Sequence, residues 1–382
     1  MAINKEQNKL NVPHLRFPEF HGEWEKCKLG DIATLTKGSG ISKDQRSATG
    51  TPCILYGELY TTYKSEVIDY VVSKTDISDK NLVRSCANDI IIPSSGETAI
   101  DISTARCVLS PDVLLGGDLN IIRLNDGDGR FFSYQLNGVR KHDIAKIAQG
   151  VSVVHLYGES IKGLTVSFPS NKEQQKISTL LSLIDERIAT QSKLIEKLES
   201  LIKGLRVRLM QIEKGNIVHL NEVARIYQPQ TISSTELTED GFFVYGANGI
   251  IGKYGNYNHK TEQICITCRG NTCGMVNYTK PMSWITGNAM VINTDDYQDK
   301  VYKRYLYHFL SAYNFNSIIS GSGQPQIVRT PLERLKVTLP TILEQKQKAI
   351  FLDEIQDKID ICNNVLSLYM RQKQYLLRQM FI

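Results

Sequence analysis

The sequence lacks any apolar run near the roughly 20 residues that a membrane-spanning helix needs. Met1 is followed by polar residues, so the apolar core of a signal peptide is also missing. These two absences argue against a membrane or secreted protein, and we expect a soluble, cytoplasmic one. The chain has 382 residues, of which 41% are hydrophobic, and this is enough for two or three globular cores.

Cysteine is sparse, and the 8 cysteines are scattered, as is usual for thiols in a reducing compartment. Cys265, Cys268 and Cys273 have a spacing that resembles half of a zinc site, to which His259 could add a ligand. An internal repeat, described below, has no cysteine at the three aligned positions, which are Ile91, Ser94 and Ala99. We therefore favour buried thiols and predict no metal site.

Motifs of catalysis are missing as well. The nearest approach to a phosphate-binding loop, Gly246 to Lys253, has glycines one residue too far apart and Tyr254 where Ser or Thr is needed. No two prolines are adjacent, which excludes the Asn/Asp-Pro-Pro-aromatic motif of amino-group methyltransferases, and Pro111-Asp112 lacks the acid-x-Lys spacing of nucleases. Three histidines have no evident catalytic partner, namely His142, His155 and His308. We predict no catalytic residue in this chain.

The sequence does contain an internal repeat, in the order globule, long helix, globule, long helix. Leu29–Ala33 returns as Leu220–Ala224 at an offset of 191, and Ile90–Thr98 returns as Ile264–Thr272 at an offset of 174. Further matches keep their order: Tyr56-Gly57 with Tyr245-Gly246, Gly117-Asp118 with Gly287-Asn288, and Gly150, Leu164, Pro169 and Glu173-Gln174 with Gly321, Leu335, Pro340 and Glu344-Gln345. The falling offset predicts longer loops in the first globule. A duplicated unit predicts a pseudo-symmetric molecule for a pseudo-symmetric partner.

Two long helices are predicted to form a coiled coil. Between Lys172 and Lys214 there is no proline, and Ile or Leu recurs in alternating steps of four and three until Lys214-Gly215 ends the helix. The second helix repeats the pattern, interrupted at Lys373, and its Cys362 aligns with Gln191 in a weak layer of the first. The predicted seam consists of Ile177, Leu181, Ile184, Ile188, Ile195, Leu198, Ile202, Leu205, Leu352, Ile355, Ile359, Leu366, Tyr369 and Leu376.

The order of the elements determines how these helices must run. The first helix leaves globule one and reaches globule two, so a second helix that pairs with it must run back, and the pair is antiparallel. Such a pair would hold two inverted globules at a fixed spacing, with helices about 60 Å long. This geometry suits a protein that reads two separated segments of a DNA double helix.

Both globules read as mixed α/β, so the predicted fold class is α/β (α+β), with two pseudo-symmetric domains joined by the antiparallel coiled coil. Strands are expected at Asp89–Ile92, Leu119–Leu124, Gln263–Thr267 and Met290–Asn293, and helical stretches at Phe131–Ala148 and Lys303–Ile319. The predicted boundaries are an N-terminal segment at 1–23, domain one at 24–170, helix one at 171–214, domain two at 215–340 and helix two at 341–382.

Polar, glycine-rich loops contain the candidate DNA-binding residues, and a net charge of +5 permits such binding. In the first globule these are Lys37, Ser39, Lys43, Arg46, Ser95, Glu97, Thr98 and Arg106. In the second they are Gln230, Asn248, Lys253, Tyr254, Tyr257, Lys260, Arg269, Asn271, Thr272, Gln324, Gln326 and Arg329. Different loops on a shared frame predict that each domain reads a different sequence.

Together these features resemble the specificity subunits of type I restriction–modification enzymes. The resemblance covers the whole chain and rests on five features: the repeat order, the Trp24…Leu29–Ala33 opening, the Val12–Phe20 segment, the Pro-x3-Glu-Gln helix starts at Pro169 and Pro340, and the glycine-rich segments before those starts. The alternatives are a coiled-coil scaffold that binds proteins without DNA specificity, and a lone enzyme such as a nuclease.

The resemblance implies that each domain is a target-recognition domain for one half of a bipartite double-stranded DNA site. The coiled coil would set the gap and dock two methyltransferase subunits that modify adenine, and two motor-nuclease subunits would complete the restriction complex. The chain itself would be non-catalytic and hold no cofactor. S-adenosylmethionine, ATP and Mg²⁺ would belong to the partner subunits.

Overall fold

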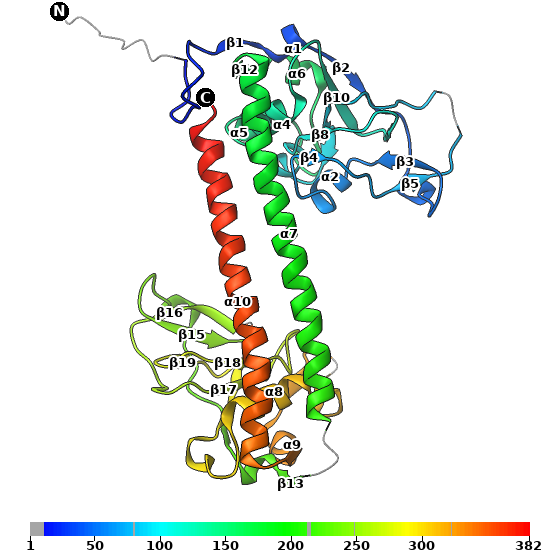
Figure 1. The fold of residues 1–382 in the computed structure, drawn as a ribbon. Helices are drawn as coiled ribbons and strands as arrows, with labels where there is room; N and C mark the ends of the chain where they lie inside the picture. Colours follow the sequence, from blue (N-terminus) through cyan, green and yellow to red (C-terminus); the bar gives the residue numbers. More distant parts are fainter. Residues whose placement is uncertain (1–10, 79–80, 212–214, 248, 322) are drawn as a thin grey trace, which may run out of the picture. The chain divides into compact units, whose positions relative to one another are not determined.

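The computed structural model describes residues 11–78, 81–211, 215–247, 249–321 and 323–382 (Figure 1). The chain forms two compact units, unit 1 from Met1–Ser192 with Val365–Ile382, and unit 2 from Lys193–Asn364. Two long helices, α7 (Asn171–Met210) and α10 (Ile342–Gln379), each contribute a segment to both units. Among the helices in the described ranges, none combines the length and the hydrophobicity needed to cross a lipid bilayer.

Unit 1 is built around a five-stranded sheet with the order β2-β10-β6-β8-β4. Its strands are β2 (Ala33–Lys37), β10 (Leu119–Leu124), β6 (Asp89–Pro93), β8 (Arg106–Val108) and β4 (Val67–Ile68). Smaller sheets pair β1 (Glu25–Lys28) with β12 (Thr165–Phe168), β7 (Ser95–Gly96) with β11 (Val154–His155), and β3 (Thr51–Ile54) with β5 (Lys74–Thr75) and β9 (Leu114–Leu115). The short helices are α1 (Leu29–Ile32), α2 (Glu58–Thr61), α3 (Ala99–Ile102), α4 (Gly129–Asn137), α5 (Lys141–Ile147) and α6 (Gly158–Lys162).

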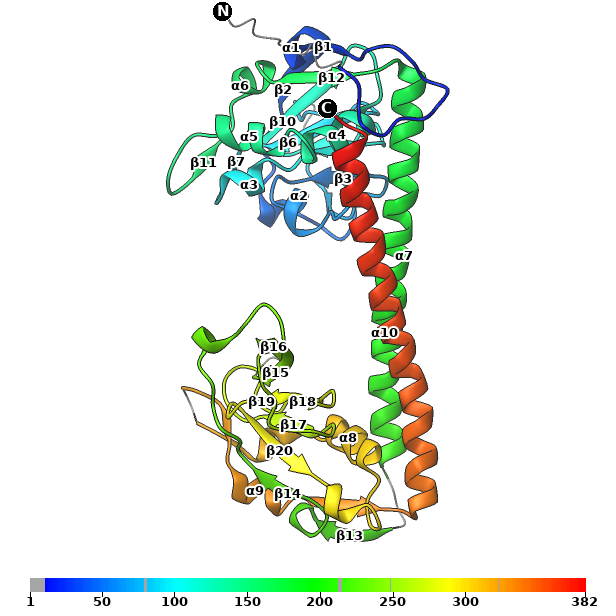
Figure 2. The ribbon, with the colours of Figure 1, turned by 90° about the vertical axis from the view of Figure 1, so that its left-hand side faces the viewer.

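Unit 2 repeats this plan with fewer elements (Figure 2). Its four-stranded sheet has the order β14 (Arg225–Tyr227), β20 (Ala289–Asn293), β17 (Ile264–Thr267) and β18 (Val276–Tyr278). A three-stranded sheet has the order β16 (Gly249–Tyr254), β15 (Phe242–Gly246) and β19 (Trp284–Ile285), and the pairs are β13 (Asn216–His219) with β23 (Lys336–Leu339) and β21 (Ile319–Ser320) with β22 (Gln326–Ile327). The helices are α8 (Lys303–Ala312) and α9 (Arg329–Glu333).

The repeat is confirmed by strand register. β10 places Ile122 opposite Leu35 of β2, and β20 places Ile292 opposite Ile226 of β14. Ile292 follows Ile122 at an offset of 170, and Ile226 follows Leu35 at an offset of 191. These are the offsets that the sequence repeat predicts for the two regions. The two globules therefore share a backbone frame as well as a few sequence motifs.

One predicted correspondence, Tyr56-Gly57 with Tyr245-Gly246, is wrong. Ile54 of β3 lies opposite Leu115 of β9 in a parallel pair, whereas Tyr245 of β15 lies opposite Ile285 of β19. Since Leu115 and Ile285 are equivalent, Tyr245 corresponds to Ile54, and the similar dipeptide is displaced by two residues. The longer loops of unit 1 lie here, because α2 and β4 separate β3 from β5, whereas β15 turns directly into β16.

Each long helix begins with a Glu-Gln pair, and the glutamine of the pair has the same structural role in both copies. The Gln174 amide accepts from the Asp128 N–H at 3.0 Å and donates to the Pro169 carbonyl at 2.8 Å. Gln345 accepts from the Tyr302 N–H at 2.8 Å and donates to the Pro340 carbonyl at 2.9 Å. Each buried glutamine thus fastens its long helix to the start of α4 or α8, and it satisfies a backbone donor that would otherwise be unpaired.

Trp24, the tryptophan of the opening, lies in the core of unit 1. The ring of Trp24 packs edge-on against Phe131 and Phe381, at centroid distances of 5.6 and 6.5 Å. The same core includes the predicted seam residues Ile177 and Leu181. The first turns of α7 therefore bury their apolar face against the globule as well as against α10.

Within each unit, the segments of α7 and α10 run antiparallel. In unit 1, Asp185 contacts Lys373 and Arg187 contacts Tyr369. In unit 2, Arg206 bonds to Gln356 at 3.1 Å, and the Leu209 carbonyl accepts from Lys348 at 3.0 Å. The residue number falls on one helix as it rises on the other, which confirms the predicted direction. Every predicted seam residue is buried or half-buried.

Two predicted helix ends are wrong. The last helical residue of α7 is Met210, although helix was predicted to Lys214, which lies outside the described residues. Gly215 allows the start of β13 to lie close to β23, because a Cβ at this position would lie 2.8 Å from the Leu339 carbonyl oxygen. The predicted helix at Phe131–Ala148 is broken into α4 and α5 at Gly138, and the one at Lys303–Ile319 ends at Ala312.

Candidate nucleic-acid interface

A hollow of about 1150 Å³ in unit 1 collects three of the predicted DNA-binding residues, Lys43, Arg46 and Glu97. A short 3-10 turn (Lys43–Gln45) presents the basic side chains, and the Gln45 carboxamide caps it by accepting from the Ser42 N–H at 2.8 Å. Gly116 lines the hollow where the chain passes close to β3, since a Cβ there would lie 3.1 Å from the Ile54 carbonyl.

The hollow also contains residues that the sequence did not single out. Tyr56 and Tyr60 line it, and Tyr56 is exposed. Arg46 extends over a buried carboxylate, with its Nη1 3.6 Å from Glu58 Oε1, while Glu58 accepts from the Leu55 N–H at 2.8 Å. Aromatic and guanidinium groups beside flexible glycines can stack on or hydrogen-bond to nucleotides. The repeat paired Tyr56 with Tyr245 but gave no sign of the hollow, because the segment with α2 and β4 has no counterpart between β15 and β16 of unit 2.

Ser95 lies opposite His155 in the β7–β11 pair, at an edge of unit 1 away from α7 (Figure 2). His155 is exposed and stacks loosely on Tyr157, with ring centroids 6.3 Å apart. His155 has no evident catalytic partner in the sequence and was not among the predicted site residues. The sequence repeat could have identified His155 as a candidate, because an offset of 171 relates it to Gln326, a predicted DNA-binding residue.

Several predicted residues of the first globule have structural partners. The Thr98 hydroxyl caps α3 by accepting from the Asp101 N–H at 3.1 Å, and Ser39 Oγ accepts from the Val83 N–H at 2.7 Å. Lys37 is exposed at the end of β2. The prediction that placed Arg106 in a surface loop is wrong, because Arg106 begins β8 and is only 8% exposed.

In unit 2, three loops that are distant in the sequence come together. The backbones of Arg269 and Gln326 form an isolated antiparallel β-bridge, and the Gly270 N–H donates to the Pro325 carbonyl at 3.0 Å. Thr272 Oγ1 donates to the Ala247 carbonyl at 2.8 Å. The side chains of Arg269, Asn271, Gln324 and Gln326 are exposed on this surface. Asn248, the other residue predicted here, lies outside the described residues.

The remaining predicted residues of unit 2 surround the β15–β16 hairpin and α9. Tyr254 packs edge-on against Trp284 with centroids 5.1 Å apart, and Tyr257 packs against Phe242 at 5.0 Å. Lys253 lies 3.6 Å from Asp240 in an exposed ion pair, and Arg329 pairs with Glu333 one turn along α9 at 2.6 Å. Gln230 and Lys260 are exposed.

The half zinc motif consists of packed thiols. Cys265 is fully buried, and burial raises the pKa of its thiol to about 12, so it stays protonated at neutral pH. Cys268 Sγ accepts from Gln228 Nε2 at 3.3 Å, and His259 bonds to Tyr227 through Nε2 at 2.8 Å. Among the described residues, no group of three His, Cys, Asp or Glu side chains could hold a metal ion.

The two globules differ at equivalent positions of this surface. The register places Ser95 opposite His155 in unit 1 and Arg269 opposite Gln326 in unit 2. Serine, histidine, arginine and glutamine all hydrogen-bond to base edges, but with different preferences. One frame therefore presents two different sets of hydrogen-bonding side chains.

Comparisons with known proteins identify relatives of this chain. A 24% identical relative, the type I restriction enzyme MjaVIII specificity subunit of Methanocaldococcus jannaschii, aligns over 416 positions, 94% of this chain and 92% of that protein. The EcoprrI specificity subunit of Escherichia coli is 28% identical over 165 residues, 42% of this chain and 39% of that protein.

Solved structures share the fold. The crystal structure of a type I restriction–modification system S subunit from M. genitalium has a TM-score of 0.71 at 19% identity, and it covers 97% of this chain and 99% of that one. The family described as type I restriction modification DNA specificity domain matches residues 21–200 and 213–367. These matches span most of both repeats, and the chain belongs to the type I restriction modification DNA specificity domain family.

Proposed function

We propose that this chain gives a type I restriction–modification complex its DNA sequence specificity and carries out no chemistry itself. Each globule would bind one half of a bipartite duplex site. The observation that carries this proposal is the shared frame with different side chains at equivalent positions, Ser95 with His155 and Arg269 with Gln326. A protein that reads two unrelated half-sites needs this combination, whereas a symmetric scaffold would repeat the same surface chemistry.

The base-reading groups of unit 2 support a direct readout. A guanidinium such as that of Arg269 can donate two hydrogen bonds to guanine, and a carboxamide such as that of Gln324 or Gln326 can bond two positions of adenine. In unit 1, Lys43 and Arg46 would contact phosphates while the tyrosines of the hollow face the bases. The antiparallel helices would fix the gap between the two half-sites.

The outer faces of the helices support a role in docking partner subunits. Large apolar side chains are exposed along both helices, and within three stretches they are seven residues apart: Leu194 and Leu201 on α7, Leu343 and Ile350 at the start of α10, and Ile361, Leu368 and Tyr375 further along α10. A heptad stripe that is not covered by the chain's own residues suits further helices. We propose that two methyltransferase subunits dock here and that two motor-nuclease subunits complete the assembly, in the cytoplasm.

The proposal assigns all chemistry and all cofactors to those partners. S-adenosylmethionine would serve the methyltransferase subunits, and ATP and Mg²⁺ the motor-nuclease subunits. This chain would hold the duplex and so position the bases that react. Purified alone with Mg²⁺, it should give no DNA cleavage products.

The decisive experiment is adenine-methylation mapping of host DNA with and without this gene. We expect one bipartite motif to lose its methylation when the gene is deleted and to regain it on complementation. An unchanged methylation pattern would contradict the proposal. In vitro, the complex with methyltransferase subunits should bind its cognate duplex with an affinity that falls steeply with salt. A protein-binding scaffold would show neither effect.

A further inference from the structure

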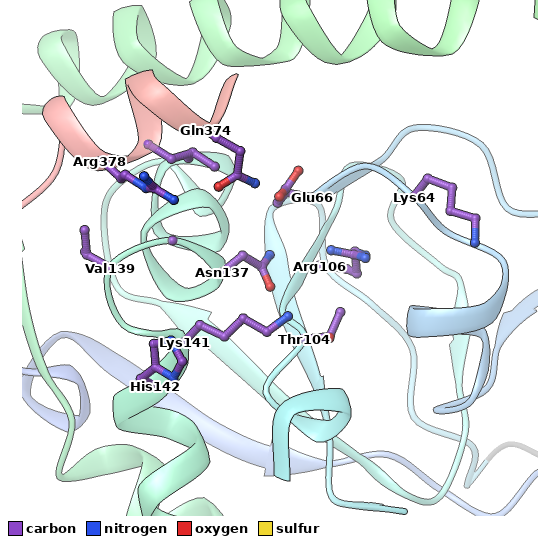
Figure 3. A pocket seen from close by; sticks show the side chains of 12 residues that line it. Lys64, Glu66, Thr104, Arg106, Asn137, Val139, Lys141, His142, Gln374 and Arg378 are labelled. Carbon is purple, nitrogen blue, oxygen red and sulfur yellow. The ribbon is translucent and has the colours of Figure 1, made fainter. Parts of the chain in front are cut away.

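A second pocket in unit 1, of about 450 Å³, lies where the globule meets the C-terminal segment of α10 (Figure 3). Its lining is unusually basic and includes Lys64, Arg106, Lys141, His142 and Arg378, with Glu66 as its one carboxylate. The side chain of Lys141 extends from α5 toward Arg106, and Arg378 reaches in from α10. Two separate parts of the chain thus bring cationic groups to one cavity.

Arg106 is the least exposed of these cations, and burial lowers its pKa more than the nearby Glu66 and Asp185 raise it. Its Nη2 donates to the Tyr63 carbonyl at 3.0 Å and its Nη1 to the Ala105 carbonyl at 3.2 Å. Its Nε is buried without a hydrogen-bond partner, and Arg106 forms no ion pair with any described residue. A guanidinium that is 8% exposed and unpaired is costly in a folded protein unless something else neutralises it.

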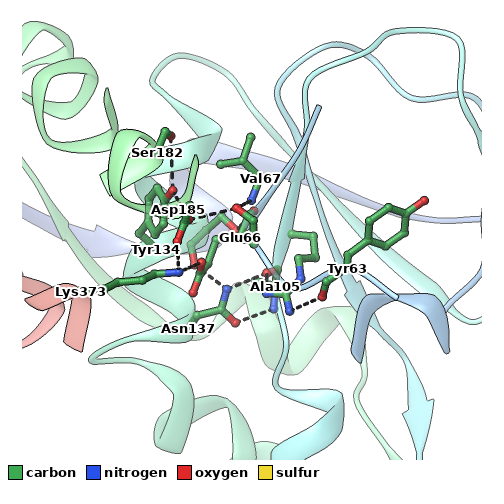
Figure 4. A network of polar contacts seen from close by, with 12 residues as sticks. Tyr63, Glu66, Val67, Ala105, Tyr134, Asn137, Ser182, Asp185 and Lys373 are labelled. Atoms are coloured by element: carbon green, nitrogen blue, oxygen red, sulfur yellow. Dashed lines mark hydrogen bonds and ion pairs between the residues drawn. The ribbon is translucent and has the colours of Figure 1, made fainter. Parts of the chain in front are cut away.

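The pocket's own carboxylate is shared with another cation. Glu66 is engaged by the Lys373 ammonium, which also contacts Asp185 (Figure 4). The ammonium of Lys141 forms no ion pair among the described residues, and burial together with the nearby Arg106 lowers the pKa of Lys141. The cavity therefore has an excess of positive charge, and its most buried cation has donors left to use.

We propose that this pocket binds a small phosphate-type oxyanion, held by Arg106 and Lys141 from the globule and by Arg378 from α10. The phosphate oxygens would accept from the Arg106 Nη groups, each of which keeps a second N–H, and from the Lys141 ammonium, and so neutralise the buried guanidinium. A duplex cannot reach this depth, because Arg106 is covered by the surrounding chain. The ligand is therefore free phosphate or the terminal phosphate of a small molecule.

The site belongs to unit 1 alone. Arg106 lies opposite Ile91 in the β6–β8 pair, and the equivalent pair in unit 2 places Asn277 opposite Cys265. The shared frame therefore does not require an arginine here. A bound anion would also join α10 to the globule, because Arg378 and Gln374 line the same cavity as Arg106.

The test measures binding of inorganic phosphate to the full-length protein, by calorimetry and by the thermal unfolding midpoint. Sodium chloride at equal ionic strength is the reference. We expect saturable binding and a higher midpoint with phosphate. Lys141→Gln, at a half-buried position, and Arg378→Gln, at an exposed one, should each weaken phosphate binding at least tenfold. Lys146→Gln on the same helix as Lys141 is the matched control and should bind like the unmodified protein, because Lys146 does not line the pocket.

Two results would overturn this assignment. One is a midpoint shift that is the same in the pocket variants as in the control, since this would be a general salt effect. The other is loss of phosphate binding in the presence of cognate duplex, together with weaker DNA binding by Lys141→Gln, since the pocket would then contact the DNA backbone. The inference does not rest on the proposed DNA specificity, and failure of either experiment leaves the other interpretable.

Discussion

The ammonium of Lys373 on α10 lies 2.5 Å from Oδ1 of Asp185 on α7 (Figure 4). The same ammonium pairs with Glu66 of the globule, and the Tyr134 hydroxyl donates to the other oxygen of Asp185 at 2.7 Å. All three charged side chains are nearly buried. A polar group in a helix seam commonly fixes the register of the pair, and this cluster does so for the segments in unit 1.

Replacing Lys373 with Met should therefore destabilise unit 1 by about 3–5 kcal/mol, because two buried carboxylates are left without a cation. Urea unfolding monitored by tryptophan fluorescence measures the change. Combining Lys373→Met with Glu66→Gln and Asp185→Asn should recover most of the loss. A single variant that loses less than about 1 kcal/mol would show that the cluster is solvated.

Removal of the glutamine at either helix start should have a similar, smaller effect in both units. Gln174→Ala leaves the Asp128 N–H without its partner, and Gln345→Ala does the same to the Tyr302 N–H. Each should cost about 1–3 kcal/mol. Gln175→Ala and Gln347→Ala, which alter exposed neighbours, are the controls and should be nearly neutral. Hydrogen exchange at the first turns of α4 and α8 locates the effect.

Unit 2 should lose stability as the pH falls below about 6.5, the ordinary histidine pKa. Burial lowers the pKa of His308, although its 2.7 Å contact with Asp353 opposes this. The unfolded chain therefore binds a proton that the folded chain does not, and the free energy of unfolding falls with decreasing pH. Burial alone would raise the pKa of Asp353, but hydrogen bonds from His308 and Arg304 lower it, so a further loss follows in more acidic solution.

Urea unfolding between pH 7 and 5 measures this dependence. His308→Gln should flatten the slope, and the part that remains belongs to His259, whose pKa burial also lowers. His21→Gln, at an exposed position, should leave the slope unchanged. Equal slopes in all three proteins would mean that His308 titrates normally.

Arg269→Ala should relax specificity in one half-site only, by about 1–3 kcal/mol if a base contact is lost. The measurement compares duplexes that carry single changes in either half. Lys260→Ala, at an exposed basic position outside the Arg269–Gln326 bridge, is the comparison and should weaken all sequences equally. If Arg269→Ala also weakens every sequence equally, Arg269 contacts phosphate.

Four residues inserted into both long helices, near Gln191 and Cys362, should lengthen the gap between the half-sites. The insertion adds about 6 Å to each helix. Methylation mapping reads the new gap directly, and the two half-site sequences should not change. An unaltered gap would exclude the helices as its determinant.

The sequence predicted the repeat, the helices and the strands of the central sheets because their apolar periodicity reflects burial against the nearest core. It did not predict features that depend on contacts between distant segments. Lys373 looked like a break in the seam, since its partners Asp185 and Glu66 lie far away in the chain. Arg106 looked like a loop cation, and only the sheet register shows that it is interior.

The sequence predicted many of the residues on the candidate DNA surface, but not which of them lie side by side. Arg269 and Gln326 were found separately, and their pairing required the fold. The repeat offset of 171 already relates His155 to Gln326, but only the strand pair shows that His155 lies opposite Ser95 at the equivalent place. Tyr56 was matched with Tyr245 by the repeat, but only the fold shows that Tyr56 and Tyr60 line a hollow.

The packing of Trp24 against Phe381 has a consequence for biosynthesis. The core that begins to form when the ribosome has made the first globule stays open until residue 381 has left the exit tunnel. Everything between must be translated first, so the apolar surface awaiting Phe381 is exposed throughout and must be kept from aggregating. Nascent-chain proteolysis should therefore find this globule incomplete until residue 381 has emerged from the ribosome.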